Sequence, residues 1–358
     1  IAIQSICARI GDVTHKGVGQ VLREHFPRPL AYLVTVALII TTVLMIGADL
    51  VAIGTAFSLL FGGKFILYIV PVATAIWLLV LFTRFETFTR YLGFVVIIFM
   101  GYIVSAVLSH PNWGEVAKAI VLPPVQFKFS YVSLALSILG ATFTPPLFFW
   151  QAQAEIEDKD GDANKREKAK KQDKLMAPGF IFGQLITLFI MIATAATLYQ
   201  HHQTIQTAAD AAKALEPFAG PAARYLFAVG LIGSGLIAIP VLASSAGYMV
   251  AEMFDWRQSL SDTVDAAKGF YIVITVALFV GVELAISGID PVQAMVASQF
   301  LSGIVGPFIM ILLLIVSNRK SVMGKYTNGA FDNIFAGLAF LVLSGSTILL
   351  LVQTVLGH

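Results

Sequence analysis

The sequence has few charged residues and one cysteine, and both shortages exclude whole classes of protein. Only 12% of the 358 residues are charged, whereas soluble domains carry roughly 25%. The single cysteine, Cys7, rules out an internal disulfide framework and a metal site built from several thiolates. What remains is strongly apolar, since hydrophobic residues make up 58% of the chain and the mean hydropathy is +0.84.

Motifs of nucleotide-driven or hydrolytic enzymes are also missing. The sequence has no Walker-type phosphate loop, no dinucleotide fingerprint and no Ser/His/Asp arrangement on a plausible soluble face. We therefore expect neither an enzyme nor transport driven directly by ATP within this chain, and no cofactor. The formal net charge of +2 is small, and we expect no nucleic-acid partner.

Long apolar runs fill most of the chain. A helix needs about 20 apolar residues to cross a bilayer core of about 30 Å, and backbone groups in lipid need internal partners, which favours helices. The sequence predicts an all-α, multi-pass protein of a plasma or inner membrane. Because the polar stretch at Gly11 follows so soon, we expect the first apolar segment to be the remainder of a span that is cut through. The ten expected segments are residues 1–10, 30–61, 64–83, 88–109, 131–156, 176–200, 222–251, 268–287, 291–317 and 331–356.

Lysine and arginine residues predict the orientation of these segments. If the loop after the first segment is cytoplasmic, 18 of the 23 basic residues fall on the cytoplasmic side, as the positive-inside rule requires. On that side, the mixed charges of residues 158–174 predict a solvated loop. On the other side, we expect a short interfacial helix at residues 113–121. The adjacent His201 and His202 are interpreted as incidental, with a metal-collecting role as the alternative.

The most informative stretch is residues 140–146, Gly-Ala-Thr-Phe-Thr-Pro-Pro, in the middle of the fifth segment. The two prolines lack N–H groups, so the carbonyls of Ala141 and Thr142 lose their helical donors, and Thr144 is pushed from helical geometry. Unsatisfied polar groups in hydrocarbon cost several kcal/mol. We expect a broken helix whose carbonyls, with the hydroxyls of Thr142 and Thr144, offer hard oxygen ligands to a cation near the midplane. The alternative is a kinked helix repaired by Ser, Thr or water.

Polar residues inside the other segments are few. Asp49 lies near the middle of the second segment, where a charge is costly, so we interpret it as functional, with a hydrogen-bonded or neutral carboxyl as the alternative. Gln4 and Gln299 are mid-span amides that can present carbonyl oxygens, although hydrogen bonding between helices explains each as well. Three further prolines stand alone and are expected only to kink their helices: Pro71, Pro240 and Pro307.

Five motifs occur in an order that resembles the Nramp family of divalent metal transporters, and they span essentially the whole chain. They are residues 4–11 (Gln-Ser-Ile-Cys-Ala-Arg-Ile-Gly), 23–29 (Arg-Glu-His-Phe-Pro-Arg-Pro), 47–50 (Gly-Ala-Asp-Leu), 140–146, and 298–302 (Ser-Gln-Phe-Leu-Ser) with Pro307-Phe308 beyond it.

The resemblance implies a LeuT-type fold of two inverted five-helix repeats plus one extra helix. The ten segments then form a single transporter domain that lacks the first helix of the family fold, a helix that also supplies acidic metal ligands. On this scheme residues 1–109 are the remainder of the first repeat, residues 131–317 the second repeat and residues 331–356 the extra C-terminal helix.

The resemblance also implies roles for individual residues. Ala141 matches a residue whose carbonyl binds metal, and Gln299 matches a metal-facing glutamine. Gln4 matches a glutamine near the site, and Asp49 an acidic residue on a proton route.

Departures from the family pattern are informative too. Thr144 and Pro146 stand where the family motif has methionine and histidine, and a hydroxyl favours softer transition metals less than a thioether does. A second acidic position on the proton route is Ala52, and the segment 268–287 has no internal arginine. This pattern resembles the Nramp-related magnesium transporters. We therefore expect uptake of Mg²⁺, with Mn²⁺ also accepted, by alternating access and without obligatory proton movement.

Other functions remain open from the sequence. One is a proton-coupled Mn²⁺ or Fe²⁺ importer with Asp49 as the proton carrier. A second is a transporter of the same fold for an organic solute such as an amino acid. A third is a membrane scaffold or receptor that transports nothing. The partners expected are divalent metal ions and the lipid bilayer, and nothing in the sequence specifies an oligomeric state.

Overall fold

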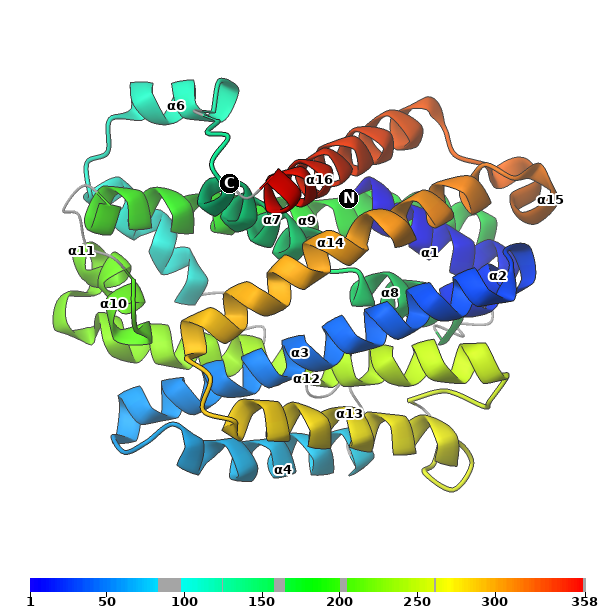
Figure 1. The fold of residues 1–358 in the computed structure, drawn as a ribbon, viewed down its shortest axis with the longest axis horizontal. Coiled ribbons are helices and arrows are strands. Elements are labelled where there is room, and N and C mark those ends of the chain that lie inside the picture. Colours follow the sequence, from blue (N-terminus) through cyan, green and yellow to red (C-terminus); the bar gives the residue numbers. More distant parts are fainter. Residues whose placement is uncertain (83–97, 124, 158–164, 200–204, 261, 357–358) are drawn as a thin grey trace.

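The computed structural model describes residues 1–82, 98–123, 125–157, 165–199, 205–260 and 262–356. Within these ranges the chain forms helices and no strands, as the sequence predicts. Long helices cross the molecule side by side, with short helices at their ends (Figure 1). The longer helices are α1 (Ala2–Thr14), α3 (Arg28–Phe61), α4 (Ile66–Phe82), α7 (Phe129–Phe143), α8 (Pro146–Glu157), α9 (Lys165–Thr194), α12 (Ala223–Phe254), α13 (Lys268–Ile286), α14 (Pro291–Ser317) and α16 (Ala330–Leu356). The short ones are α2 (Val18–His25), α6 (Trp113–Val121), α10 (Ala208–Ala212), α11 (Glu216–Ala219) and α15 (Lys320–Met323).

The predicted spans agree with these helices. Among the described residues, seven stretches are long and apolar enough to cross a membrane, and two shorter apolar helices, Ile66–Phe82 and Ile98–Leu108, fall where spans are predicted. Residues 88–97 of the fourth predicted segment lie outside the described residues, as do His201 and His202. The short helix predicted at residues 113–121 is α6, and the Asn112 side chain caps it by accepting from the Gly114 and Glu115 amides at 3.1 and 3.3 Å.

Two stretches predicted as loops are helical. Helix α9 begins at Lys165, so the second part of the charged stretch 158–174 is helix, while residues 158–164 lie outside the described residues. Its residues are mostly Lys, Arg, Glu, Ala and Gln, which are strong helix formers, and this propensity outweighs the polarity that predicts a loop. On the same side of the membrane, α1 continues past Ile10 to Thr14, and α2 follows it.

Two hydrophobic cores lie on either side of the central pair α3 and α12. Helix α12 packs most extensively against α3. One core joins α1, α2, α7, α8, α14 and α16. The other joins α4 and α13 to the middle of α3 and α12. Both central helices contribute side chains to both cores. Of the broken helix, α7 packs against α14 and α16, whereas α8 packs against α1 and α12.

Candidate functional site: the break between α7 and α8

The break occurs where the two prolines predict it. Helix α7 ends at Phe143, Thr144 lies in the left-handed region with φ of 38°, and α8 begins at Pro146. A tight turn joins the two helices, since the Thr144 amide donates to the Gly140 carbonyl and the Leu147 amide to the Thr144 carbonyl, each at 3.0 Å. A β-branched residue at positive φ is an outlier, and such backbone strain gathers at functional sites.

The oxygens at the break are only partly satisfied. The residue four positions after Ala141 is Pro145, so the Ala141 carbonyl has no helical donor, and the Thr144 hydroxyl donates to it instead at 2.6 Å. The Thr142 hydroxyl donates to the Ile138 carbonyl at 2.9 Å. Both hydroxyls donate their proton to carbonyls of the chain itself, and their lone pairs remain for a ligand.

Helix α14 approaches the break closely at two glycines. A Cβ added at Gly140 would lie 2.0 Å from the Gln299 carbonyl oxygen, and one added at Gly303 would lie 2.6 Å from the Leu136 carbonyl oxygen. Only glycine allows this approach. The contact brings Gln299 beside the residue that precedes Ala141. The side-chain Oε1 of Gln299 is buried and has no hydrogen-bond partner among the residues that the structure describes, a condition that a water or a cation would relieve.

Asp49, in α3, lies at a height along the helices similar to that of Gln299 in α14. One turn before it, the Met45 sulfur accepts a hydrogen bond from the Ser302 hydroxyl of α14 at 3.3 Å. Helices α3 and α14 run in opposite directions (Figure 1), so Asp49 and Gln299 lie on the same side of this contact, each about one turn away. Asp49 is half-buried there.

Gln4 lies level with the start of α8. Helix α1 packs along α8, and both run toward the end of the molecule that carries α2 (Figure 1). A Cβ added at Gly11 would lie 2.3 Å from the Ala152 carbonyl oxygen. Gln4 lies about two turns before Gly11 in α1, and the break lies about two turns before Ala152 in α8. Gln4 and the break are therefore level with each other. Gln4 is 9% exposed.

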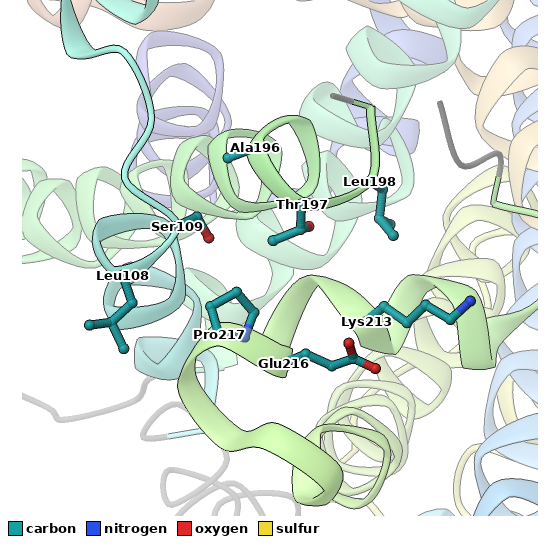
Figure 2. A pocket seen from close by; sticks show the side chains of 8 residues that line it. All are labelled: Leu108, Ser109, Ala196, Thr197, Leu198, Lys213, Glu216 and Pro217. Carbon is teal, nitrogen blue, oxygen red and sulfur yellow. The ribbon is translucent and has the colours of Figure 1, made fainter. Parts of the chain in front are cut away.

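A pocket of about 480 Å³ lies elsewhere, near α11 and the end of α9. Figure 2 shows Ser109 and Thr197 on one side of it and Glu216 with Pro217 on the other. None of the residues that line it is a predicted site residue, so the pocket and the break are separate features.

Sequence reasoning missed one buried acid, Glu252. The segment predicted at residues 222–251 ends just before it, whereas α12 continues to Phe254. Glu252 is 2% exposed. An ionisable residue inside an apolar helix is the signal that identifies such a position, and an error of a few residues at the helix end hides it.

The fold and the broken helix define a multi-pass membrane protein built like a secondary transporter. Comparison with solved structures shows the same fold. Two structures of the manganese transporter of Eremococcus coleocola, one of a histidine-to-alanine mutant and one of a complex with an aromatic bis-isothiourea compound, each match with a TM-score of 0.68, at 21% and 19% identity. Each match covers 98% of this chain and 76% of the other. The LeuT-like fold is therefore confirmed.

Sequence comparison identifies the family. The profile of the Nramp family, described as natural resistance-associated macrophage protein-like, matches residues 1–353. A curated relative, the divalent metal cation transporter MntH of Burkholderia ambifaria, is 27% identical over 350 residues, which cover 96% of this chain and 76% of the relative. This chain belongs to the Nramp family. The expectation of a transporter rather than an enzyme is confirmed, and family membership favours a metal ion over an organic solute as the cargo.

Proposed function

We propose that this protein carries divalent metal ions across a plasma or inner membrane and holds the ion at the break between α7 and α8. The proposal is carried by one observation. The Ala141 carbonyl, which has no helical donor, lies next to Gly140, and Gly140 packs against Gln299, whose Oε1 is buried without a partner among the described residues. Within the proposal, these two oxygens with spare acceptor capacity, one from α7 and one from α14, bind the same ion. Oxygen ligands of this kind suit hard divalent cations.

Further ligands come from the same region. Thr144 and Thr142 keep hydroxyl lone pairs, and Gln4 lies level with the break from α1. Within this proposal, residues 1–109 and 131–317 form the two repeats, and residues 331–356 form the extra helix.

For the identity of the ion, we propose Mn²⁺ with Mg²⁺ also accepted. The relatives named for their cargo include a manganese transporter and MntH, which favours Mn²⁺. The residues of this chain favour hard ions in addition, because Thr144 places a hydroxyl where a thioether would select softer transition metals. Mg²⁺ dehydrates reluctantly, so its entry requires a site that admits a partly hydrated ion.

For the coupling, we propose metal movement without obligatory proton movement. The second acidic position of the family's proton route is matched by Ala52 in α3, which cannot carry a proton, and α13 carries no arginine between its ends. A second candidate is proton-coupled transport with Asp49 as the carrier. One observation favours it, because the Met45–Ser302 contact places Asp49 at the depth of Gln299.

Flux into proteoliposomes tests the proposal. We expect saturable uptake of Mn²⁺ and Mg²⁺ that does not acidify a lumen loaded with a pH-sensitive dye. Metal entry accompanied by stoichiometric acidification would establish the Asp49 alternative. Vesicles that take up no divalent metal at all would contradict the proposed function.

Thr144→Met sharpens the selectivity argument. A thioether at this position should raise Cd²⁺ uptake relative to Mg²⁺ by about tenfold, the ratio that ~1.4 kcal/mol of differential binding produces. Thr74→Met is the matched control, because Thr74 is an exposed residue of α4 whose hydroxyl likewise bonds its own helix. An unchanged Cd²⁺ to Mg²⁺ ratio in Thr144→Met would remove Thr144 from the selectivity argument.

A further inference from the structure

Glu252 caps a helix to which it does not belong. The N-cap of α2 is Gly17, which has no side chain to satisfy the first amides of the helix. The Oε2 atom of Glu252, in α12, accepts from the Gly19 amide at 2.5 Å instead. This oxygen satisfies one of the amides that have no partner within the helix. A Cβ added at Gly17 would lie 1.9 Å from Glu252 Oε1, so glycine at this position is what admits the carboxylate.

The other end of α2 is held by the residues that end α12. Arg23, in the last turn of α2, donates to the Met253 carbonyl at 2.9 Å and forms an ion pair with Asp255. This hydrogen-bonded ion pair also lowers the pKa of the Asp255 carboxyl below its ordinary value. Both ends of α2 are therefore fastened to the same short stretch of α12.

The same face of α12 holds the second half of the broken helix. One turn before Glu252, the Tyr248 hydroxyl donates to Glu157 Oε1 at 2.9 Å, and Glu157 is the last residue of α8. Tyr248 and Glu252 are four residues apart, so they share one face of α12, and Asp255 follows as its C-cap residue. Tyr248 is 2% exposed, like Glu252.

These bonds act on one packed group of helices. Helix α1 lies against α8 at Gly11 and Ala152, and α2 follows α1 directly in the chain. Met249 and Met253 of α12 belong to the hydrophobic core that contains α1, α2 and α8. The polar bonds thus lie at the rim of an apolar contact, on the side of the membrane predicted to be cytoplasmic.

We propose that Arg23, Glu157, Tyr248, Glu252 and Asp255 form a clasp that fastens α1, α2 and α8 to α12, and that opening of the clasp exposes the metal site to the cytoplasm. This inference rests on the proposed function, because a gate has a purpose only in a transporter. The clasp lies at the far end of α8 from the break. It therefore sets the rate at which the site opens and does not contribute to the binding of the ion.

Cys7 provides a native reporter for the test. It is the only cysteine of the chain, lies in α1 and is fully buried, so its alkylation by N-ethylmaleimide requires α1 to leave its packing. The variants are Glu252→Gln, which keeps the size of the side chain, and Arg23→Gln. The matched controls are Glu24→Gln, which removes the exposed ion pair between Glu24 of α2 and Lys16, and Asp262→Asn, which removes the Arg257–Asp262 pair beyond the end of α12.

We expect alkylation of Cys7 to be about tenfold faster in Glu252→Gln, since one of the two buried carboxyl oxygens at the start of α2 is replaced by an NH2 group that can only donate, and faster by a smaller factor in Arg23→Gln. The controls should stay within about twofold of the wild type, because exposed ion pairs contribute little. Equal rates in Glu252→Gln and the controls would overturn the clasp. If Glu252→Gln fails to fold, the alkylation rates of Arg23→Gln and Asp262→Asn are compared instead, and equal rates would overturn the clasp.

Mn²⁺ flux in the same vesicles separates gating from binding. The clasp predicts that Glu252→Gln changes the maximal rate and leaves KM unchanged, and a changed KM would overturn the gating role. Alkylation is measured without metal, so it tests the clasp even if wild-type vesicles carry no metal, in which case only the proposed function fails.

Discussion

Helix α12 and the pair α7–α8 both cross the molecule and both contain proline in an apolar run, yet only the second is broken. Helix α12 continues through Pro240 from Ala223 to Phe254. The other run stops at Phe143 and starts again at Pro146. Pro71 and Pro307 likewise lie inside unbroken helices. A lone proline removes one hydrogen bond, which an otherwise regular helix survives.

The second proline changes the outcome because it acts on the residue that the first has already constrained. Pro145 disfavours helical geometry at Thr144, and Pro146 in turn disfavours it at Pro145. Two carbonyls lose their donors instead of one. The chain resolves the conflict by turning at Thr144, which adopts positive φ. The comparison teaches that proline marks a candidate site only where the local backbone geometry forces the helix to break.

The largest effect on metal binding is expected from a variant in which one continuous helix can replace α7 and α8. In the double variant Pro145→Ala with Pro146→Ala, alanine amides can donate to the carbonyls of Ala141 and Thr142, and α7 and α8 can join. We expect the affinity for Mn²⁺ to fall by at least about tenfold, since the loss of one ligand contact of ~1.4 kcal/mol is sufficient, and flux to fall with it. Calorimetry on the purified protein measures the affinity. Binding as tight as in the wild type would separate the break from the metal site.

Close packing at the break predicts that two glycine-to-alanine substitutions have different effects on the melting temperature. Alanine normally stabilises a helix by up to about 1 kcal/mol relative to glycine, and nothing lies within 4 Å of a Cβ added at Gly337 of α16. Gly337→Ala should therefore raise or preserve the melting temperature in detergent. Gly140→Ala places a Cβ against the backbone of α14, so overpacking of about 1–3 kcal/mol should lower it. Gly140→Ala melting at or above the wild-type temperature would contradict the geometry of the site.

The sequence alone predicts the break and the helix positions, because prolines and long apolar runs act locally. Which helix meets the break depends on tertiary contacts, and only the structure brings Gly140 of α7 against Gln299 of α14. The hydroxyl of Thr144 shows the same limit, since its bond to the Ala141 carbonyl follows from a backbone angle that the sequence does not specify. Glu252 is hidden from the sequence by a helix end that is predicted a few residues too early.

A smaller effect is expected from the lone proline of the comparison. In Pro240→Ala, the new amide can donate to the Leu236 carbonyl within a helix that is already continuous. The gain of one hydrogen bond and the loss of the buried ring oppose each other, so we expect Mn²⁺ flux within about twofold of the wild type. Measured beside the double variant at residues 145 and 146, this substitution controls for removal of proline as such. A loss of flux as large as that of the double variant would show that a single proline in α12 matters as much as the break.

The smallest effect is expected from pH at the C-terminal end of α12, where the continuous helix brings its C-cap residue Asp255 to Arg23. The pKa of Asp255 is below its ordinary value because Arg23 donates to it. An acid with a depressed pKa stabilises the folded state above its unfolded pKa, and that stabilisation is lost only as the pH falls through the lower folded value. The ion pair should therefore persist between pH 7.5 and 5.5. We expect hydrogen-exchange protection of residues 22–26, corrected for intrinsic rates, to change by less than about twofold over this range. Asp255→Asn should show the lower protection at every pH. Protection that disappears by pH 5.5 in the wild type but not in Asp255→Asn would mean that the ion pair titrates far above the range that Arg23 imposes on it.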